Sequence, residues 1–221
     1  MSVNEKYHAV FKPGECYHVY NCTNNGEKLF RSNENYYFFL KKYGHYMQPF
    51  AETFAYNLLP NHFHTVCRLR SAETIQQYLA CIKQENLLKA ELAFLENTEL
   101  YFDNLIESQF HRFFTSYSMS FNKMYSRKGN LFHRAFKRVH IADEKQLFHT
   151  VIYVHANAVK HKIVKQLEGY PFTSYHSYLS DAASLLSREE IFNLFGGKEA
   201  FVRMHKEQTD YYYKDPGFDD E

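Results

Sequence analysis

The sequence contains no tryptophan, four cysteines and no long apolar run among its 221 residues. The cysteines show no Cys-x-x-Cys spacing, and their positions on expected strands and a helix favour buried, reduced thiols. No stretch approaches the roughly 18 consecutive apolar residues of a membrane span, and the N-terminus lacks the apolar region of a secretory signal. These absences predict a cytoplasmic protein without a membrane segment.

Two further absences narrow the chemistry. The chain has no glycine-rich phosphate loop, so nucleotide hydrolysis is not indicated. It also offers no paired carboxylates near the motifs described below. A zinc hydrolase normally adds a third His, Cys or carboxylate to a histidine pair at a recognisable spacing, and this chain shows no such spacing.

Aromatic residues and an uneven charge pattern are what the chain does have. Its 19 Tyr and 21 Phe fill a core or stack on unpaired bases, and a core is the better explanation. The net charge of +1 conceals a stretch, residues 108–142, that has no Asp or Glu. This stretch favours a polyanion-binding surface over a solvated helix face. Its Lys and Arg residues are Arg112, Lys123, Arg127, Lys128, Arg134, Lys137 and Arg138.

Hydrophobic periodicity predicts alternating strands and helices. Strands are expected over 15–22, 52–59, 62–70 and 131–141, and helices over about 34–48, 72–95, 99–126 and 144–157, with caps at Asn33, Ser71 and Asp143. The order β-α-β-β-α-α-β-α predicts an α+β fold, a ferredoxin-like antiparallel sheet with helices packed on one face. We expect a domain over 1–168, followed by a small helical C-terminal extension and an acidic tail over 169–221.

His62 and His64 begin the third expected strand. Residues two apart on a strand point to the same face of the sheet. Two neutral imidazoles on one face make half of a divalent-metal site. A turn histidine and a half-buried strand histidine are the structural alternative. Cys67 should point to the other face.

The expected helix over 144–157 offers the missing groups. Tyr153 and Asn157 are four residues apart and therefore share a helix face. The amide oxygen of Asn157 could complete a hard-cation site, and Tyr153 would face the same metal as a nucleophile. Asn157 could instead be a helix C-cap, with His149 as the substitute ligand. His155 and His161 are expected on the surface or facing DNA.

Together these residues resemble a known family. Leu59-Pro-Asn-His-Phe-His64 resembles the HUH motif of single-tyrosine transposases, and the chain is similar to the REP-associated tyrosine transposases, a bacterial group. The resemblance continues through most of the chain, in Gly14-Glu-Cys-Tyr-His-Val-Tyr-Asn21, Gly129-Asn-Leu-Phe-His-Arg-Ala-Phe-Lys-Arg138, Tyr153-Val-His-Ala-Asn-Ala-Val-Lys-His161 and Tyr170-Pro-Phe-Thr-Ser-Tyr175. It departs from the family pattern at Cys22, Ala158 and Lys162, where Arg, Pro and Gly are usual.

The resemblance implies a function. It assigns Tyr153 as the nucleophile and His62, His64 and Asn157 as ligands of Mg²⁺ or Mn²⁺. Residues 1–168 would form the catalytic domain, which would cut single-stranded DNA beside a hairpin through a 5′-phosphotyrosine link and rejoin the ends. The protein would act in the cytoplasm as a monomer or a homodimer, with the 108–142 segment gripping phosphates.

Two other functions remain open at this point. One is a hairpin-binding protein that no longer cuts nucleic acid. The other is a metal-dependent nuclease that forms no covalent intermediate. A further hypothesis has the acidic tail after about residue 189 covering the DNA groove.

Overall fold

The centre of the molecule is a four-stranded antiparallel sheet. The structure is a computed structural model that describes residues 7–133 and 135–214. The sheet contains β1 (Cys16–Cys22), β2 (Ala51–Leu59), β3 (His62–Leu69) and β4 (Lys137–Ile141) in the order β2-β3-β1-β4. The β2–β3 hairpin turns at Pro60 and Asn61, so β3 begins directly at His62.

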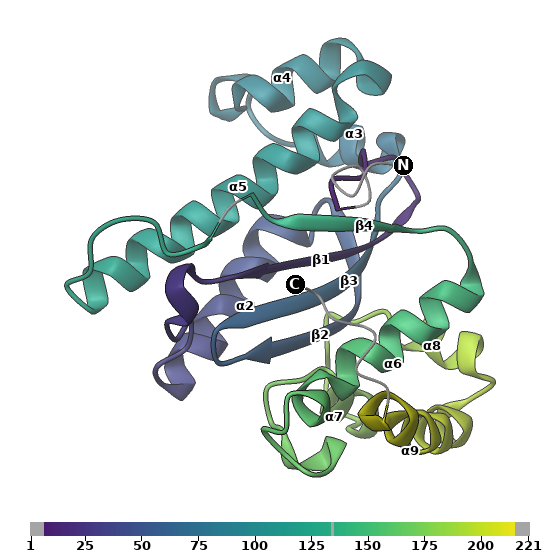
Figure 1. The fold of residues 1–221 in the computed structure, drawn as a ribbon. Helices are drawn as coiled ribbons and strands as arrows, with labels where there is room; N and C mark the ends of the chain where they lie inside the picture. Colours follow the sequence, from purple (N-terminus) through teal and green to yellow (C-terminus); the bar gives the residue numbers. More distant parts are fainter. Residues whose placement is uncertain (1–6, 134, 215–221) are drawn as a thin grey trace.

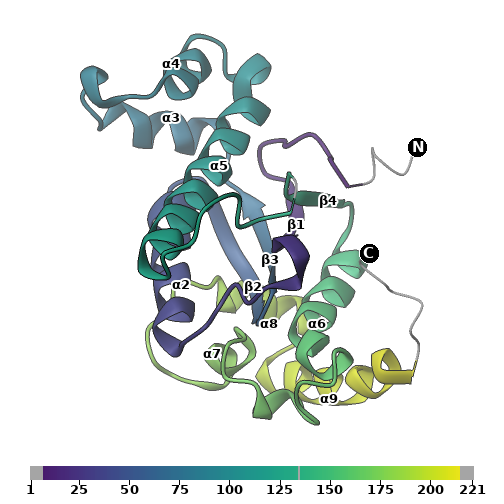
Figure 2. The same ribbon diagram turned by 60° about the vertical axis from the view of Figure 1, so that its left-hand side comes forward.

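Helices α2 (Asn33–Met47) and α5 (Thr98–Met124) cover one face of the sheet (Figures 1 and 2). Phe39 and Phe113 from these helices meet Tyr17, Val19 and Phe63 of the strands in one buried aromatic core. Two shorter helices, α3 (Ala72–Ala80) and α4 (Lys89–Glu96), lie near the first turns of α5. Most of the phenylalanine content is therefore core, as expected.

Helix α6 (Glu144–Lys160) lies on the other face of the sheet and is followed by α7 (Tyr175–Leu179), α8 (Arg188–Phe195) and α9 (Lys198–Lys214). Ile152 of α6 shares a second core with Ala55 and Val66 of the sheet and with Tyr178 and Phe201 of the C-terminal helices. Every α6 residue from 151 to 159 is buried, because the sheet lies on one side of the helix and α9 on the other.

The predicted α+β fold with an antiparallel sheet is confirmed, but one detail of the packing differs. Helices cover both faces rather than one, because β2 and β3 bury side chains on both sides: Leu58 and Phe63 in the first core, Ala55 and Val66 in the second. The domain boundary at residue 168 stays a prediction.

Several local predictions can be compared with the structure. Ser71 and Asp143 cap their helices, accepting hydrogen bonds from the backbone N–H groups of residues 74 and 146. Ser32, not Asn33, is the N-cap of α2. The helix expected over 72–95 is interrupted between α3 and α4, where the Glu91 carboxylate accepts the Leu88 backbone N–H and starts a new helix. The fourth strand is shorter than expected and begins at residue 137.

All four cysteines are free thiols, but burial was predicted for more of them than the structure shows. Cys67 is buried on the face away from α6, as expected, and Cys16 is half-buried. Cys22 and Cys81 are exposed, because they lie at element ends. Within the described residues, no helix has the length and apolar content needed to cross a membrane.

Candidate active site

The pairing of the strands gathers polar side chains on the face beneath α6. His64 lies opposite Tyr20 of β1 and Asn57 of β2, and His62 lies opposite Cys22. His18, two residues before Tyr20, shares this face. The sequence pattern His18-x-Tyr20 therefore meets His62-x-His64 across one strand boundary.

Tyr153 of α6 packs against this cluster from the helix side of the sheet. Its ring packs edge-on against His64 and His18, with ring centroids 6.1 Å and 6.0 Å away. Two turns after Tyr153, the ring of His161 packs against the ring of His62, with ring centroids 4.9 Å apart. The two predicted metal histidines thus lie under one stripe of α6.

Asn157 lies midway along that stripe, between Tyr153 and His161, and therefore faces the histidine pair. Its side chain is fully buried. Neither its amide oxygen nor its amide nitrogen has a hydrogen-bond partner in the described part of the chain. A buried amide without partners is costly, and such a group is expected where a ligand completes the site. Helix α6 continues to Lys160 with His161 as its C-cap, so the C-cap role considered for Asn157 is wrong.

His64 has the protonation state that a metal ligand needs. His64 is buried, and this burial, followed by the nearby His18, His62, His161 and Lys160, holds its pKa well below the ordinary value. The Nδ1 atom of His62 is 2.8 Å from Asn61 Oδ1, and Nδ1 of His64 is 2.9 Å from His18 Nε2. A neutral imidazole is the form that binds metals.

The donor set is two imidazoles and one amide. Among residues 7–133 and 135–209, no group of three or more His, Cys, Asp or Glu side chains is arranged to hold a metal ion. A metal ion at this site could take the amide oxygen of Asn157 as its third ligand, and the lack of another partner for that oxygen among the described residues fits such a role. His149, the substitute ligand considered above, lies one turn before Tyr153 and contacts Phe148.

No protein-family model matches the sequence, and no curated protein sequence matches it. Among solved structures, the chain is similar to the REP-associated tyrosine transposase bound to a REP hairpin, with a TM-score of 0.53 and 16% sequence identity over 82% of this chain and 93% of that chain. This chain has the fold of that transposase. The resemblance inferred from the sequence motifs is therefore confirmed at the level of the fold.

The predicted DNA-binding residues divide into two groups on this transposase fold. Three arginines are held by carboxylates within the protein: Arg112 by Glu91, Arg127 by Glu27, and Arg138 by Asp103 and Glu107. Lys123 and Lys128 are exposed near the end of α5, and Lys137 lies over the ring of Tyr20. Arg134 lies outside the described residues.

Several site residues were not assigned from the sequence. His18 and Tyr20 flank His64, and Lys160 places its Nζ 5.1 Å from the centre of the Tyr153 ring. The repeated His-x-aromatic and His-x-His alternation on two strands was a usable signal for His18. The signal for Lys160 was its spacing of seven residues from Tyr153, which places both on one helix face.

His155 was expected on the surface, and this prediction is wrong. It is buried because it lies on the side of α6 that faces α9 and the residue before α7. Its Nδ1 lies 2.8 Å from His205 Nε2, and its Nε2 lies 2.7 Å from Ser174 Oγ.

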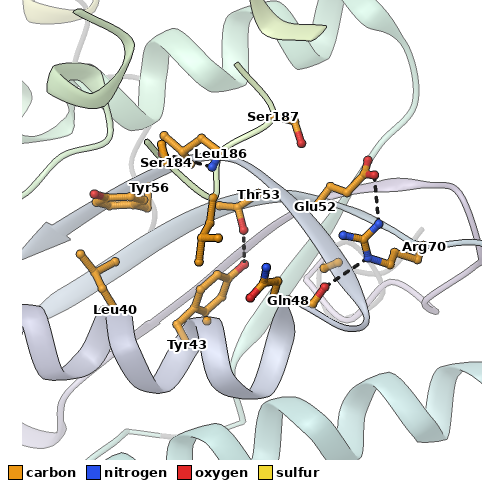
Figure 3. A pocket seen from close by; sticks show the side chains of 13 residues that line it. Leu40, Tyr43, Gln48, Glu52, Thr53, Tyr56, Arg70, Ser184, Leu186 and Ser187 are labelled. Carbon is orange, nitrogen blue, oxygen red and sulfur yellow. Dashed lines mark hydrogen bonds and ion pairs between the residues drawn. The ribbon is translucent and has the colours of Figure 1, made fainter. Parts of the chain in front are cut away.

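A cavity of about 280 Å³ lies elsewhere, between α2, β2 and the 184–187 loop (Figure 3). Several of its polar groups bind one another: Thr53 Oγ1 donates to Tyr43 Oη at 3.3 Å, and Arg70 donates to both Glu52 and the Gln48 carbonyl. None of the histidines of the α6 face lines it. The candidate active site is therefore the histidine, tyrosine and asparagine cluster.

Proposed function

We propose that the protein is a metal-dependent enzyme that nicks and rejoins single-stranded DNA beside hairpins, with Tyr153 as nucleophile. The observation that carries this proposal is the contact of the Tyr153 ring with His64. Tyr153 lies one helical turn from the buried amide of Asn157, which has no hydrogen-bond partner among the described residues. The REP hairpin in the similar solved structure supports hairpin DNA as the partner.

The residues present would carry out the chemistry as follows. The Tyr153 phenol loses its proton to solvent water, and the phenolate oxygen attacks the DNA phosphorus. The bond from phosphorus to the 3′-oxygen breaks, the 3′-oxygen takes up a proton, and a 5′-phosphotyrosine link remains. A free 3′-hydroxyl can reverse the same exchange and join the ends. The Lys160 ammonium lies 5.1 Å from the centre of the Tyr153 ring, so a positive charge is present beside the nucleophile.

His62, His64 and Asn157 would hold the divalent ion, Mg²⁺ or Mn²⁺. When bound, such an ion supplies a Lewis acid that polarises a phosphate oxygen. Imidazole ligands suit Mn²⁺ somewhat better than Mg²⁺ on ligand softness. The low pKa of His64 keeps its ring neutral for this role.

The acid-free 108–142 segment would contact the DNA backbone. In this proposal Lys123, Lys128 and Lys137, with Arg134, contact phosphates. The arginines paired with carboxylates would stabilise the part of the protein that carries those lysines.

Tyr153→Phe tests the nucleophile. We expect this variant to bind a labelled DNA hairpin with single-stranded flanks as tightly as wild type but to form no covalent adduct with Mn²⁺ on a denaturing gel. Tyr125→Phe is the matched control, because its hydroxyl donates to Asn35 at 2.7 Å, away from the histidines; it should form the adduct normally.

The same gel separates the alternatives. Hairpin binding by the wild type without cleavage would indicate a silent binding protein. Cleavage without an adduct would indicate a nuclease that uses water directly. An adduct that persists in Tyr153→Phe would show that another residue is the nucleophile.

A further inference from the structure

Both histidines of the proposed metal pair have the same ring nitrogen engaged. His62 Nδ1 faces Asn61 Oδ1 at 2.8 Å, and His64 Nδ1 faces His18 Nε2 at 2.9 Å. In the His64 ring, Nε2 is then the atom that can face a ligand. Asn61 of the β2–β3 turn and His18 of β1 therefore each face the Nδ1 atom of one of these imidazoles.

The protons follow from these contacts. A neutral imidazole has one N–H donor and one lone pair. The Asn61 oxygen accepts a hydrogen bond, so His62 carries its proton on Nδ1 and its lone pair on Nε2. In the His64–His18 pair, one nitrogen must donate and the other accept. His64 can offer Nε2 to a metal only if its Nδ1 donates and His18 Nε2 accepts.

His18 is itself held in a fixed orientation. Its side chain is 7% exposed, and its ring stacks on Tyr20 with centroids 4.7 Å apart and meets Tyr153 edge-on. The β1–β3 register places it opposite Val66, two residue pairs from the Tyr20–His64 pair and on the same face of the sheet. A ring so constrained can hold the acceptor nitrogen in one place, which is what an outer partner of a metal ligand must do.

We propose that His18 is a positioning residue for the metal site: its Nε2 accepts the Nδ1 proton of His64 and thereby fixes the tautomer that turns His64 Nε2 toward the ion. Asn61 does the same for His62. This inference rests on the proposed function, because it assumes that His62 and His64 bind a divalent ion.

Mn²⁺ affinity in the absence of DNA tests the proposal, measured near neutral pH from the EPR signal of the free ion. His18→Phe keeps a ring but has no acceptor, and we expect it to weaken Mn²⁺ binding by about 10–100-fold. His18→Gln supplies an amide oxygen as acceptor and should bind within a few-fold of wild type. His140→Phe is the matched control: His140 lies on the adjacent strand and contacts Glu15, away from the site.

The Mn²⁺ affinities of His18→Phe and His18→Gln, compared with each other, separate a positioning role from a packing role. If His18 only fills space, Phe should replace it better than Gln in both thermal stability and metal binding. Equal Mn²⁺ affinity in wild type and folded His18→Phe would overturn the proposal while leaving the metal site intact. No Mn²⁺ binding by the wild type would overturn the metal site and this inference together.

A second measurement needs no substitution. Long-range ¹H–¹⁵N spectra of histidine-labelled wild type report which ring nitrogen carries the proton. We expect His64 protonated on Nδ1 and His18 unprotonated on Nε2. The reverse arrangement would overturn the proposal even if His18→Phe does not fold.

Discussion

At the scale of single residues, two buried asparagines differ in what they contribute. Asn57 donates through Nδ2 to the carbonyl oxygens of residues 154 and 155, at 2.8 Å and 3.3 Å, and so ties β2 to α6. Asn157 is equally buried, and both of its amide atoms lack a partner within the described part of the chain. The first asparagine stabilises the fold, whereas the second fits the proposed role of a metal ligand.

This difference predicts an unusual variant. Asn157→Leu removes an unpaired buried amide, which costs about 1–3 kcal/mol, and should raise the unfolding free energy of the metal-free protein by about 1 kcal/mol. It should also abolish the stabilisation that Mn²⁺ gives to wild type. Urea unfolding with and without Mn²⁺ measures both effects.

Asn57→Leu is the control for that experiment. It removes two hydrogen bonds and should lower the unfolding free energy by about 1–3 kcal/mol. A destabilised Asn157→Leu protein would mean that the Asn157 amide has a structural partner.

The residue scale also shows what the sequence could predict. Strand alternation predicted that His62 and His64 share one face of the sheet, and helix periodicity predicted that Tyr153 and Asn157 share one face of a helix. Both patterns are local, so the sequence records them. The role of His18 depends on the β1–β3 register, which links residues 46 positions apart. No local pattern fixes that register.

At the scale of elements, α5 and β4 carry cations of two kinds. Lys123 and Lys128 are exposed, whereas Arg138 is 8% exposed, between Asp103 and Glu107 and over the Phe11 ring. Their sequence context is the same acid-free segment. The lysines and Arg138 differ only through the packing of α5 against β4, which places the Asp103 and Glu107 carboxylates beside Arg138.

We therefore expect different results from neutralising each kind. Lys123→Gln with Lys128→Gln should weaken hairpin DNA binding and reduce the slope of log affinity against log salt by about 1.4, the value for two single-strand phosphate contacts. Their thermal midpoint should not change. Salt titrations by fluorescence anisotropy give the slope.

Arg138→Gln provides the comparison. It should lower the unfolding free energy by about 1–3 kcal/mol, because two partly exposed carboxylates lose their cation. If it instead changes only the salt slope and leaves stability unaltered, Arg138 belongs with the phosphate contacts.

The predictions of helices also succeeded or failed for local reasons. Asp143 and Ser71 are short capping side chains directly before apolar periodicity, and both cap as expected. The interruption between α3 and α4 was missed, because residues 81–88 carry neither Gly nor Pro. The capping contact of Glu91 with Leu88 provides the new start.

At the scale of the whole molecule, a buried polar chain joins the C-terminal helices to the rest. His205 Nδ1 donates to the Phe201 carbonyl, so its Nε2 accepts from His155 Nδ1–H, and His155 Nε2 accepts from the Ser174 hydroxyl. Burial lowers the pKa of His205 to about 4, although the bond to Phe201 opposes the shift. Burial and then the neighbouring His205 and His176 hold the pKa of His155 well below its ordinary value.

The sign of the resulting pH dependence is fixed. In the unfolded chain a histidine takes up its proton near the ordinary pKa of 6.5, whereas folded His205 stays neutral down to about 4. The unfolded state therefore binds more protons in this window, and stability, fully present above pH 6.5, falls as the pH decreases toward 4. Each such histidine contributes a slope of up to about 1.4 kcal/mol per pH unit.

Urea unfolding at a series of pH values checks this prediction. His205→Phe should reduce the slope of unfolding free energy against pH, between about pH 6.5 and pH 5, by up to about 1.4 kcal/mol per pH unit, the contribution of one proton. An identical slope in wild type and His205→Phe would mean that His205 does not titrate in this window.

The sequence predicted the sheet and its order of elements, because amphipathic alternation records one buried face of each strand. It did not predict that the second face is also covered. The reason is visible in α6, where residues 151–159 are buried without exception by partners that follow in the chain. His155 was misplaced for this reason, since its burial depends on α9.

The enclosure of α6 has a consequence for catalytic turnover under the proposed function. A helix buried along residues 151–159 between the sheet and α9 holds the Tyr153 phenol at one position. Cutting one strand and joining another then requires the two DNA ends to exchange places at a stationary oxygen. The rate of rejoining would depend on how quickly a tethered strand diffuses into position, and so on the length and folding of the DNA between its ends.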